Sequence, residues 1–257
     1  MRPMRVCIVA FAINALSSAF AQSTDALPGD NQHYGEIQHY GEIADPSVWP
    51  ISAVGVVTVA LFSRQMQCTG TLVAPKLVLT AAHCLFNGKL LVNSGNVRFL
   101  AGLNKGVPAA HADAKRLVVP KEFSPGPPTR DSVVNDWAII VLSDAISTKP
   151  IPVRPTTRDE LRLINPASTM QIGYGRDRLY LPSVVRDCSV VESPDNRLFN
   201  HKCLVNFGYS GAPIIAQVGG DTAVIGINSV GDPQRRNGMA CSATQFAKAV
   251  AELMRSE

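Results

Sequence analysis

Apolar residues along most of the chain occur in short runs of six to ten positions, separated by turn-forming residues. The runs are rich in β-branched residues and are too short for typical helices, so each is predicted to form a strand. The predicted strands cover residues 53–62, 76–82, 96–102, 137–142, 169–175, 212–218 and 222–230. Many short strands at this spacing predict an all-β barrel or sandwich.

A proline-rich passage, residues 149–161, divides the body of the chain into two halves of similar length. We therefore expect a first lobe over about 51–148 and a second lobe over about 149–243. Three apolar residues then recur at helical spacing and predict one short helix over about 244–256. Their positions are Phe246, Val250 and Leu253.

Residues 1–21 have the organisation of a secretory signal peptide. Two arginines precede an apolar stretch from Val6 to about Leu16, and the Ala-Phe-Ala at 19–21 forms a small-x-small cleavage site. The stretch is too short to span a membrane stably, and no other apolar run reaches spanning length. We therefore expect a secreted or periplasmic protein with no membrane association after cleavage.

Residues 22–50 are predicted to form a flexible acidic leader or propeptide. They contain a perfect tandem repeat, QHYGEI twice over 32–43, and carry five acidic and no basic side chains. The rest of the mature chain carries 22 Lys and Arg against 15 Asp and Glu, a net charge of about +7. This charge contrast predicts that the leader docks on the body and holds it latent. Because the basic residues are scattered and do not cluster with aromatic ones, nucleic-acid binding is not expected.

Five cysteines remain after removal of the signal peptide, and in an exported protein they are expected to form disulfides. They are Cys68, Cys84, Cys188, Cys203 and Cys241. A Cys68–Cys84 bond would close a loop of about 15 residues and stabilise the fold by about 3 kcal/mol. His201 lies near Cys203, but the chain has no zinc-finger spacing, and neither a metal nor an organic cofactor is predicted.

Two of these segments carry residues suited to acid–base chemistry. His83 adjoins Cys84, so a disulfide there would hold the imidazole rigidly. Asp136 immediately precedes a buried strand, where a carboxylate can accept the imidazole N–H and orient the ring. Asp131 is a rival for this role, although it sits in a polar loop with no strand behind it.

Ser210 is the candidate nucleophile. It lies between Gly208 and Gly211, and Gly208 lets the amides of residues 208 and 210 point to one place as an oxyanion hole. The three candidates follow one another in the order His, Asp, Ser. An α/β-hydrolase needs its histidine after the serine, but the last histidine here is His201, so that class is excluded.

The segments LTAAHC, NDWAIIVL and GYSGAP resemble the three catalytic blocks of the chymotrypsin/trypsin-like serine endopeptidases, in the same order. The similarity covers about residues 51–257. The segment INSVG, which contains Ser229, resembles the strand that lies along the substrate backbone and whose serine supports the catalytic aspartate.

This resemblance implies two six-stranded antiparallel β-barrels, with the active site in the cleft between them and a short C-terminal helix. It implies that His83 is the general base, that Asp136 orients it and that Ser210 attacks the scissile carbonyl. The expected partner is a polypeptide substrate, and we expect a monomer.

The chain also departs from the animal digestive enzymes, which place an aspartate directly before the serine to bind a new amino terminus. That residue is Tyr209 here, and residues 48–55 lack the usual Ile-Val-Gly-Gly start. The pattern is more similar to the bacterial glutamyl-endopeptidase-type branch, which implies a Cys188–Cys203 bond. Cys241 is then left buried and unpaired, or bridges to another chain.

Substrate preference is read from the positions that the resemblance assigns to the pocket. These are Leu204, Ser229, Val230, Gly231 and Gly238. Leu204 stands six residues before the serine, where trypsin-like enzymes carry an aspartate, so a preference for basic side chains is not expected. Arg235 and Arg236 could accept an acidic side chain, but Asn228 replaces the histidine of glutamyl-specific relatives. An apolar preference is therefore favoured over an acidic one.

Two other functions are considered for the same fold. A catalytically silent binding protein would result if Tyr209 distorted the oxyanion loop. An exported esterase would use the same three catalytic residues on ester substrates.

Overall fold

The computed structural model describes residues 41–62, 65–232 and 237–257. The predicted signal peptide and residues 22–40 of the predicted leader lie outside the described residues. So do Arg235 and Arg236, which were considered as partners of an acidic substrate.

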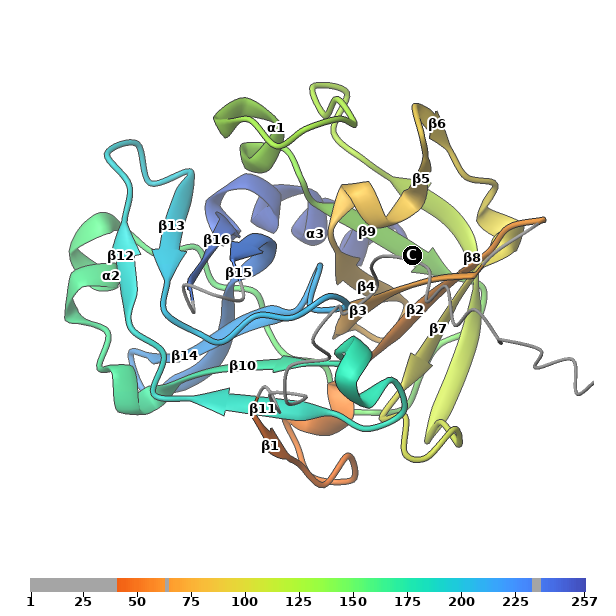
Figure 1. Ribbon diagram of the computed structural model, residues 1–257, viewed down its shortest axis with the longest axis horizontal. Helices are drawn as coiled ribbons and strands as arrows, with labels where there is room; N and C mark the ends of the chain where they lie inside the picture. Colours follow the sequence, from red (N-terminus) through yellow and green to blue (C-terminus); the bar gives the residue numbers. More distant parts are fainter. Residues whose placement is uncertain (1–40, 63–64, 233–236) are drawn as a thin grey trace, which may run out of the picture. The chain divides into compact units, whose positions relative to one another are not determined.

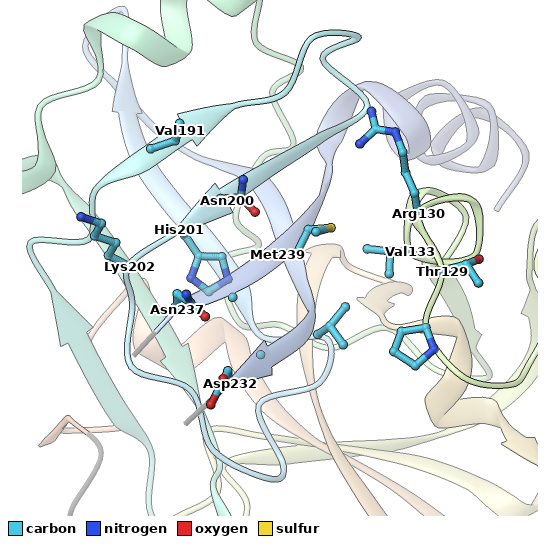
Figure 2. A pocket seen from close by; sticks show the side chains of 14 residues that line it. Thr129, Arg130, Val133, Val191, Asn200, His201, Lys202, Asp232, Asn237 and Met239 are labelled. Carbon is cyan, nitrogen blue, oxygen red and sulfur yellow. The ribbon is translucent and has the colours of Figure 1, made fainter. Parts of the chain in front are cut away.

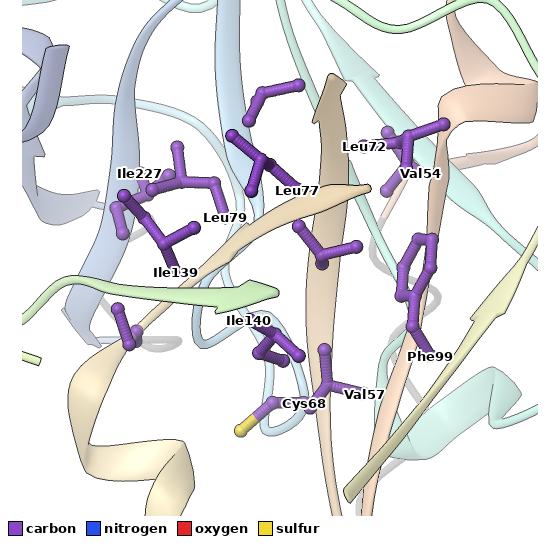
Figure 3. Close-up of a cluster of buried hydrophobic side chains, with 14 of the residues drawn as sticks. Val54, Val57, Cys68, Leu72, Leu77, Leu79, Phe99, Ile139, Ile140 and Ile227 are labelled. Carbon is purple, nitrogen blue, oxygen red and sulfur yellow. The ribbon is translucent and has the colours of Figure 1, made fainter. Parts of the chain in front are cut away.

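The first lobe is a closed antiparallel barrel of six strands (Figure 1). In hydrogen-bonded order the strands are β2 (Val54–Ala60), β3 (Gln65–Ala74), β4 (Leu77–Thr80), β9 (Ala138–Leu142), β8 (Ala110–Val118) and β7 (Val97–Ala101). Buried side chains from these strands, among them Leu79, Phe99 and Ile140, belong to one apolar cluster (Figure 3). All five residues of β9 are buried, which explains why this strand is apolar throughout rather than alternating.

The second lobe is built on an eight-stranded antiparallel sheet. In hydrogen-bonded order its strands are β1 (Glu42–Ile43), β11 (Ser183–Arg186), β10 (Thr169–Gly173), β14 (Pro213–Val218), β15 (Asp221–Asp232), β16 (Asn237–Ser242), β13 (Leu198–His201) and β12 (Val190–Glu192).

This sheet differs in detail from the predicted second six-stranded barrel. Strands β11 and β12 lie toward opposite ends of the sheet, yet only residues 187–189 separate them along the chain. Asp187 there has a φ of +57°, which breaks the extended run. If β11 and β12 are counted as one interrupted strand, the sheet curls into a six-stranded barrel-like arrangement. Strand β1 is then an additional strand that pairs with β11.

The predicted C-terminal helix is confirmed as α3 (Ala243–Ser256), which begins at the N-cap Ser242. Phe246 and Val250 are buried, and the Phe246 ring packs on Trp137 with ring centroids 6.3 Å apart. Shorter elements complete the fold: β5 (Phe86–Asn87), β6 (Leu90–Leu91), α1 (Arg130–Val134), α2 (Arg158–Leu163), η1 (Ile51–Ala53), η2 (Ala82–Leu85), η3 (Ser94–Asn96), η4 (Pro166–Ser168) and η5 (Arg176–Arg178). None of the described helices is long and apolar enough to cross a bilayer.

Residues 41–50, which were predicted to belong to the flexible leader, are instead part of the folded unit. Strand β1 pairs with β11, with Ile43 opposite Ser183. Trp49 packs against the main apolar cluster, and Lys149 Nζ lies 4.3 Å from the centre of its ring. The folded body therefore begins before residue 51.

Candidate active site

His83 lies on η2, directly after strand β4 of the first barrel. A disulfide joins its neighbour Cys84 to Cys68 on β3, so η2 is fixed to an adjacent strand. The imidazole remains accessible, with 40% of the side chain exposed.

Asp136 is brought beside His83 by the pairing of β4 with β9. Thr80 lies opposite Ala138 in this ladder, so the residues just beyond the two strand ends meet. Helix α1 ends immediately before Asp136, and the side chain of Thr129 caps that helix. Asp131, the rival acid, is exposed on α1.

Three donors surround the Asp136 carboxylate, which is only 6% exposed. The His83 amide donates to Oδ1 at 2.8 Å, and His83 Nδ1 lies 2.7 Å from Oδ2. The Ser229 hydroxyl, from β15, also donates to Oδ2. A carboxylate at Nδ1 fixes the imidazole with Nε2 free to accept a proton.

The pKa values of this pair move in opposite directions. Burial acts to lower the pKa of His83, but the hydrogen bond and the charge of Asp136 outweigh it, so the pKa lies above its ordinary 6.5. Burial acts to raise the pKa of Asp136, but the hydrogen bonds from His83 and Ser229 and the charge of His83 hold it below its ordinary 3.8.

Ser210 lies in a turn, residues 206–211, that we call the oxyanion turn. Gly208 has a φ of +98°, and a Cβ there would collide with the Tyr174 carbonyl, so only glycine fits. In the described ranges, the amides of Gly208 and Ser210 donate to no other backbone group.

Thr69, on β3 of the first barrel, holds this turn. Its amide donates to the Ser210 carbonyl at 2.9 Å, and its hydroxyl donates to the Gly208 carbonyl at 2.8 Å. A Cβ on Gly211 would lie 2.8 Å from the Ala81 nitrogen, two residues before His83. The serine turn of the second lobe is thus packed against the histidine turn of the first.

Asn228 holds the turn from the other side. Its side-chain amide donates to the Tyr209 carbonyl at 3.1 Å, and its own carbonyl accepts the Gly211 amide at 2.8 Å. The buried His201 Nε2 lies 3.0 Å from Asn228 Oδ1. Burial, opposed by this hydrogen bond, lowers the pKa of His201 to about 4, so the ring is neutral at physiological pH.

Two cavities adjoin these residues and meet at Val133 and Val230. The smaller, about 240 Å³, contains His83, Asp136 and Ser229. The larger, about 550 Å³, lies between α1 and strands β13 and β16, as Figure 2 shows. Its lining is mixed: Val133, Val191, Val230 and Met239 supply apolar side chains, and half of the lining residues are polar or charged.

The structure separates the five predicted pocket residues, and Ser229 lines the smaller cavity. Val230, Gly231 and Gly238 line the larger cavity. Leu204 instead packs, half-buried, against the apolar cluster of the second lobe. A Cβ on Gly231 would collide with the buried Val205, so Val205 fills the space beneath this glycine. Sequence reasoning missed Val205 because its apolar side chain carries no signal of its own.

Of the five cysteines that the structure describes, four form disulfides. Among the described residues, the one group with suitable spacing for a metal is Cys68, His83 and Cys84, and its two sulfurs are bonded to each other. Cys203 is likewise bonded to Cys188. The buried Cys241 thiol donates to the Val134 carbonyl at 3.1 Å.

A family model and a curated relative both match this chain. The Trypsin family model matches residues 49–251. Serine protease SP24D of Anopheles gambiae is 28% identical over 163 residues, which cover 59% of this chain and 56% of that protein. The chain thus spans little more than half the length of this curated relative.

Two solved structures share the fold at 20% identity and a TM-score of 0.64. The Vibrio cholerae VesB protease aligns over 84% of this chain and 67% of its own. A Glu endopeptidase solved in complex with MPD aligns over 86% of this chain and 99% of its own.

Proposed function

The chain belongs to the trypsin family, and from this premise we propose that it is an exported serine endopeptidase. The observation that carries the proposal is the hydrogen-bonded group of His83, Asp136 and Ser229, packed beside the Ser210 turn. A silent binding protein would have no need of an imidazole oriented in this way.

In the proposed reaction, the Ser210 hydroxyl attacks the scissile carbonyl while His83 Nε2 takes its proton. Asp136 stabilises the imidazolium that forms, because its charge lies at Nδ1. The oxyanion is stabilised by the amides of Gly208 and Ser210. His83 then protonates the leaving amine, and water hydrolyses the acyl-enzyme through the same base.

The proposed substrate is a polypeptide with an apolar side chain near the scissile bond. The larger cavity supports this preference, because three valines and Met239 line it and it shares Val230 with the smaller cavity at His83. Arg130 and Lys202 also border it, but Arg130 is already paired with Asp195 at 2.7 Å.

Export is proposed from the signal-peptide pattern of residues 1–21. The two disulfides, Cys68–Cys84 and Cys188–Cys203, support it because such bonds persist in oxidising compartments.

The experiment that tests the proposal is covalent labelling of the mature protein by a fluorophosphonate, measured by intact mass. We expect a single adduct in the wild type and none in Ser210→Ala. A second control, Ser143→Ala, removes an exposed hydroxyl that donates to Asp144 and should leave the adduct in place.

Absence of the adduct from folded, disulfide-bonded protein, with or without residues 22–40, would contradict the proposal and favour a binding protein. If the adduct forms, a panel of peptide and ester substrates distinguishes the endopeptidase from an esterase. Cleavage of esters alone would refute the peptidase assignment.

A further inference from the structure

The short element η5 ties the oxyanion turn to a neighbouring segment of the second lobe. The Arg176 amide donates to the Phe207 carbonyl at 2.8 Å. Asn206 Nδ2 donates to Asp177 Oδ1 at 2.6 Å. Both bonds hold residues immediately before Gly208, whose amide is proposed to bind the oxyanion.

The third residue of η5, Arg178, reaches the other way, to strand β1. Its side chain is only 12% exposed. Its Nη1 donates to the Gly41 carbonyl at 2.9 Å and lies 3.3 Å from the Ser183 hydroxyl. A further hydrogen bond joins Ser183 to the phenol of Tyr209, which is fully buried.

A continuous chain of polar contacts thus runs from the backbone just before β1 to the residue before Ser210. The Tyr209 ring also packs against Gly173, where a Cβ would collide with it. Tyr209 offers no negative charge that could bind an amino terminus. Its phenol instead forms the final contact in this series of polar contacts.

We infer that Arg178 is a positioning residue, which fastens β1 to the oxyanion turn. Docking of an internal strand, rather than a free amino terminus, then sets the orientation of the Gly208 amide. The inference rests on the proposed peptidase function. It implies that no processing upstream of Gly41 is needed to form the catalytic geometry.

The first test is Arg178→Ala, assayed on a peptide substrate. Loss of one oxyanion donor lowers kcat in such enzymes by about 10²–10³-fold. A Gly208 amide that is only less well positioned should lower kcat by less, so we expect a decrease of about 10- to 100-fold. KM should stay within about two-fold, because the substrate cavities are untouched. Arg98→Ala is the matched control, since it removes the same charge from an exposed ion pair with Asp113.

The second test releases β1 without touching Arg178. Glu42→Pro removes a strand amide and should lower kcat as Arg178→Ala does. Glu42→Ala keeps the backbone and loses only a weak contact with Arg186 at 4.0 Å, so it should behave as wild type. If both changes act through one chain of contacts, the double variant should be no slower than the slower single variant.

Hydrogen exchange distinguishes positioning from general destabilisation. Amides of residues 206–210 should exchange faster in Arg178→Ala and in Glu42→Pro, while those of 82–87 stay protected. Unchanged kcat in both variants, in a wild type that labels at Ser210, would overturn this inference and leave the peptidase proposal intact. A wild type that does not label would overturn both. If Arg178→Ala does not fold, Glu42→Pro against Glu42→Ala still decides.

Discussion

The side chain of Thr69 joins the first barrel to two segments of the second lobe near Ser210. Its hydroxyl donates to the Gly208 carbonyl and accepts the Tyr174 amide at 3.0 Å. Thr69 is fully buried. If its hydroxyl were removed, the Gly208 carbonyl and the Tyr174 amide would have no water molecule to replace it as a hydrogen-bond partner.

We therefore predict that Thr69→Val lowers the free energy of unfolding by about 3 kcal/mol, because it leaves buried backbone groups without a partner. It should also lower kcat, since the Gly208 carbonyl is freed. Denaturant unfolding and steady-state kinetics measure the two effects. Thr58→Val, on the neighbouring strand, should change stability by less than about 0.5 kcal/mol. Equal losses in the two variants would contradict the role given to Thr69.

The pH dependence of labelling follows from His83. Only the neutral imidazole can take the Ser210 proton, so labelling slows as the pH falls through the pKa of His83. Because Asp136 raises that pKa, we predict a midpoint above 6.5. In Asp136→Asn only burial remains to act on the ring, so an NMR titration should find its pKa below 6.5. A wild-type midpoint below 6.5 would mean that burial dominates.

At the residue scale, the sequence indicates side chains that lie in recognisable local motifs. His83, Asp136 and Ser229 were named from such motifs, and the structure places them in one hydrogen-bonded group. The partners of Thr69 lie 105 and 139 residues away, and no periodicity or spacing indicates contacts at such a distance.

At the scale of elements, the two disulfides provide a matched pair. They span sequence separations of 16 and 15 residues, so loss of either should cost a similar amount of chain entropy, about 3 kcal/mol. Only the first adjoins His83. We predict that Cys68→Ala/Cys84→Ala lowers both stability and kcat, whereas Cys188→Ala/Cys203→Ala lowers mainly stability. Unfolding curves and kcat for the two variants test this, and an equal loss of kcat would argue against it.

The predicted strands can also be compared with the strands of the structure. Six of the seven predicted strands contain a strand of the structure, and the seventh, 222–230, lies within β15, because runs of large apolar residues mark buried positions. Strand β8 was missed, since its buried positions are the small Ala112 and Ala114. The break between β11 and β12 depends on the positive φ of Asp187, which hydropathy does not register.

At the scale of the whole molecule, composition suggested a leader that ends at residue 50. Strand β1 escaped notice because two residues pair through their backbone and need no side-chain pattern. The acidic side chains upstream of β1 remain the basis of the predicted latency.

We predict that deleting residues 22–40 speeds labelling of the mature protein. The deletion removes Asp25, Asp30 and Glu36, whose attraction to a basic body is screened over about 10 Å at 0.1 M salt. The intact chain should therefore gain activity with added salt, and the shortened chain should not. A full-length variant with these three acids changed to amides is the control. Equal labelling rates and folding yields with and without the leader would refute latency.

The hydrogen bond from Thr69 to the oxyanion turn also determines when this turn can form during synthesis of the chain. A growing chain presents His83 and Asp136 long before Ser210, and its first barrel can close while the nucleophile is still missing. The oxyanion turn acquires its shape only when β3 and β15 hold it from opposite sides, and β15 is among the last strands to be synthesised. Long-range contacts of this kind form late. A nascent or truncated chain therefore has no working nucleophile, and the cell that makes it is not exposed to its activity during synthesis.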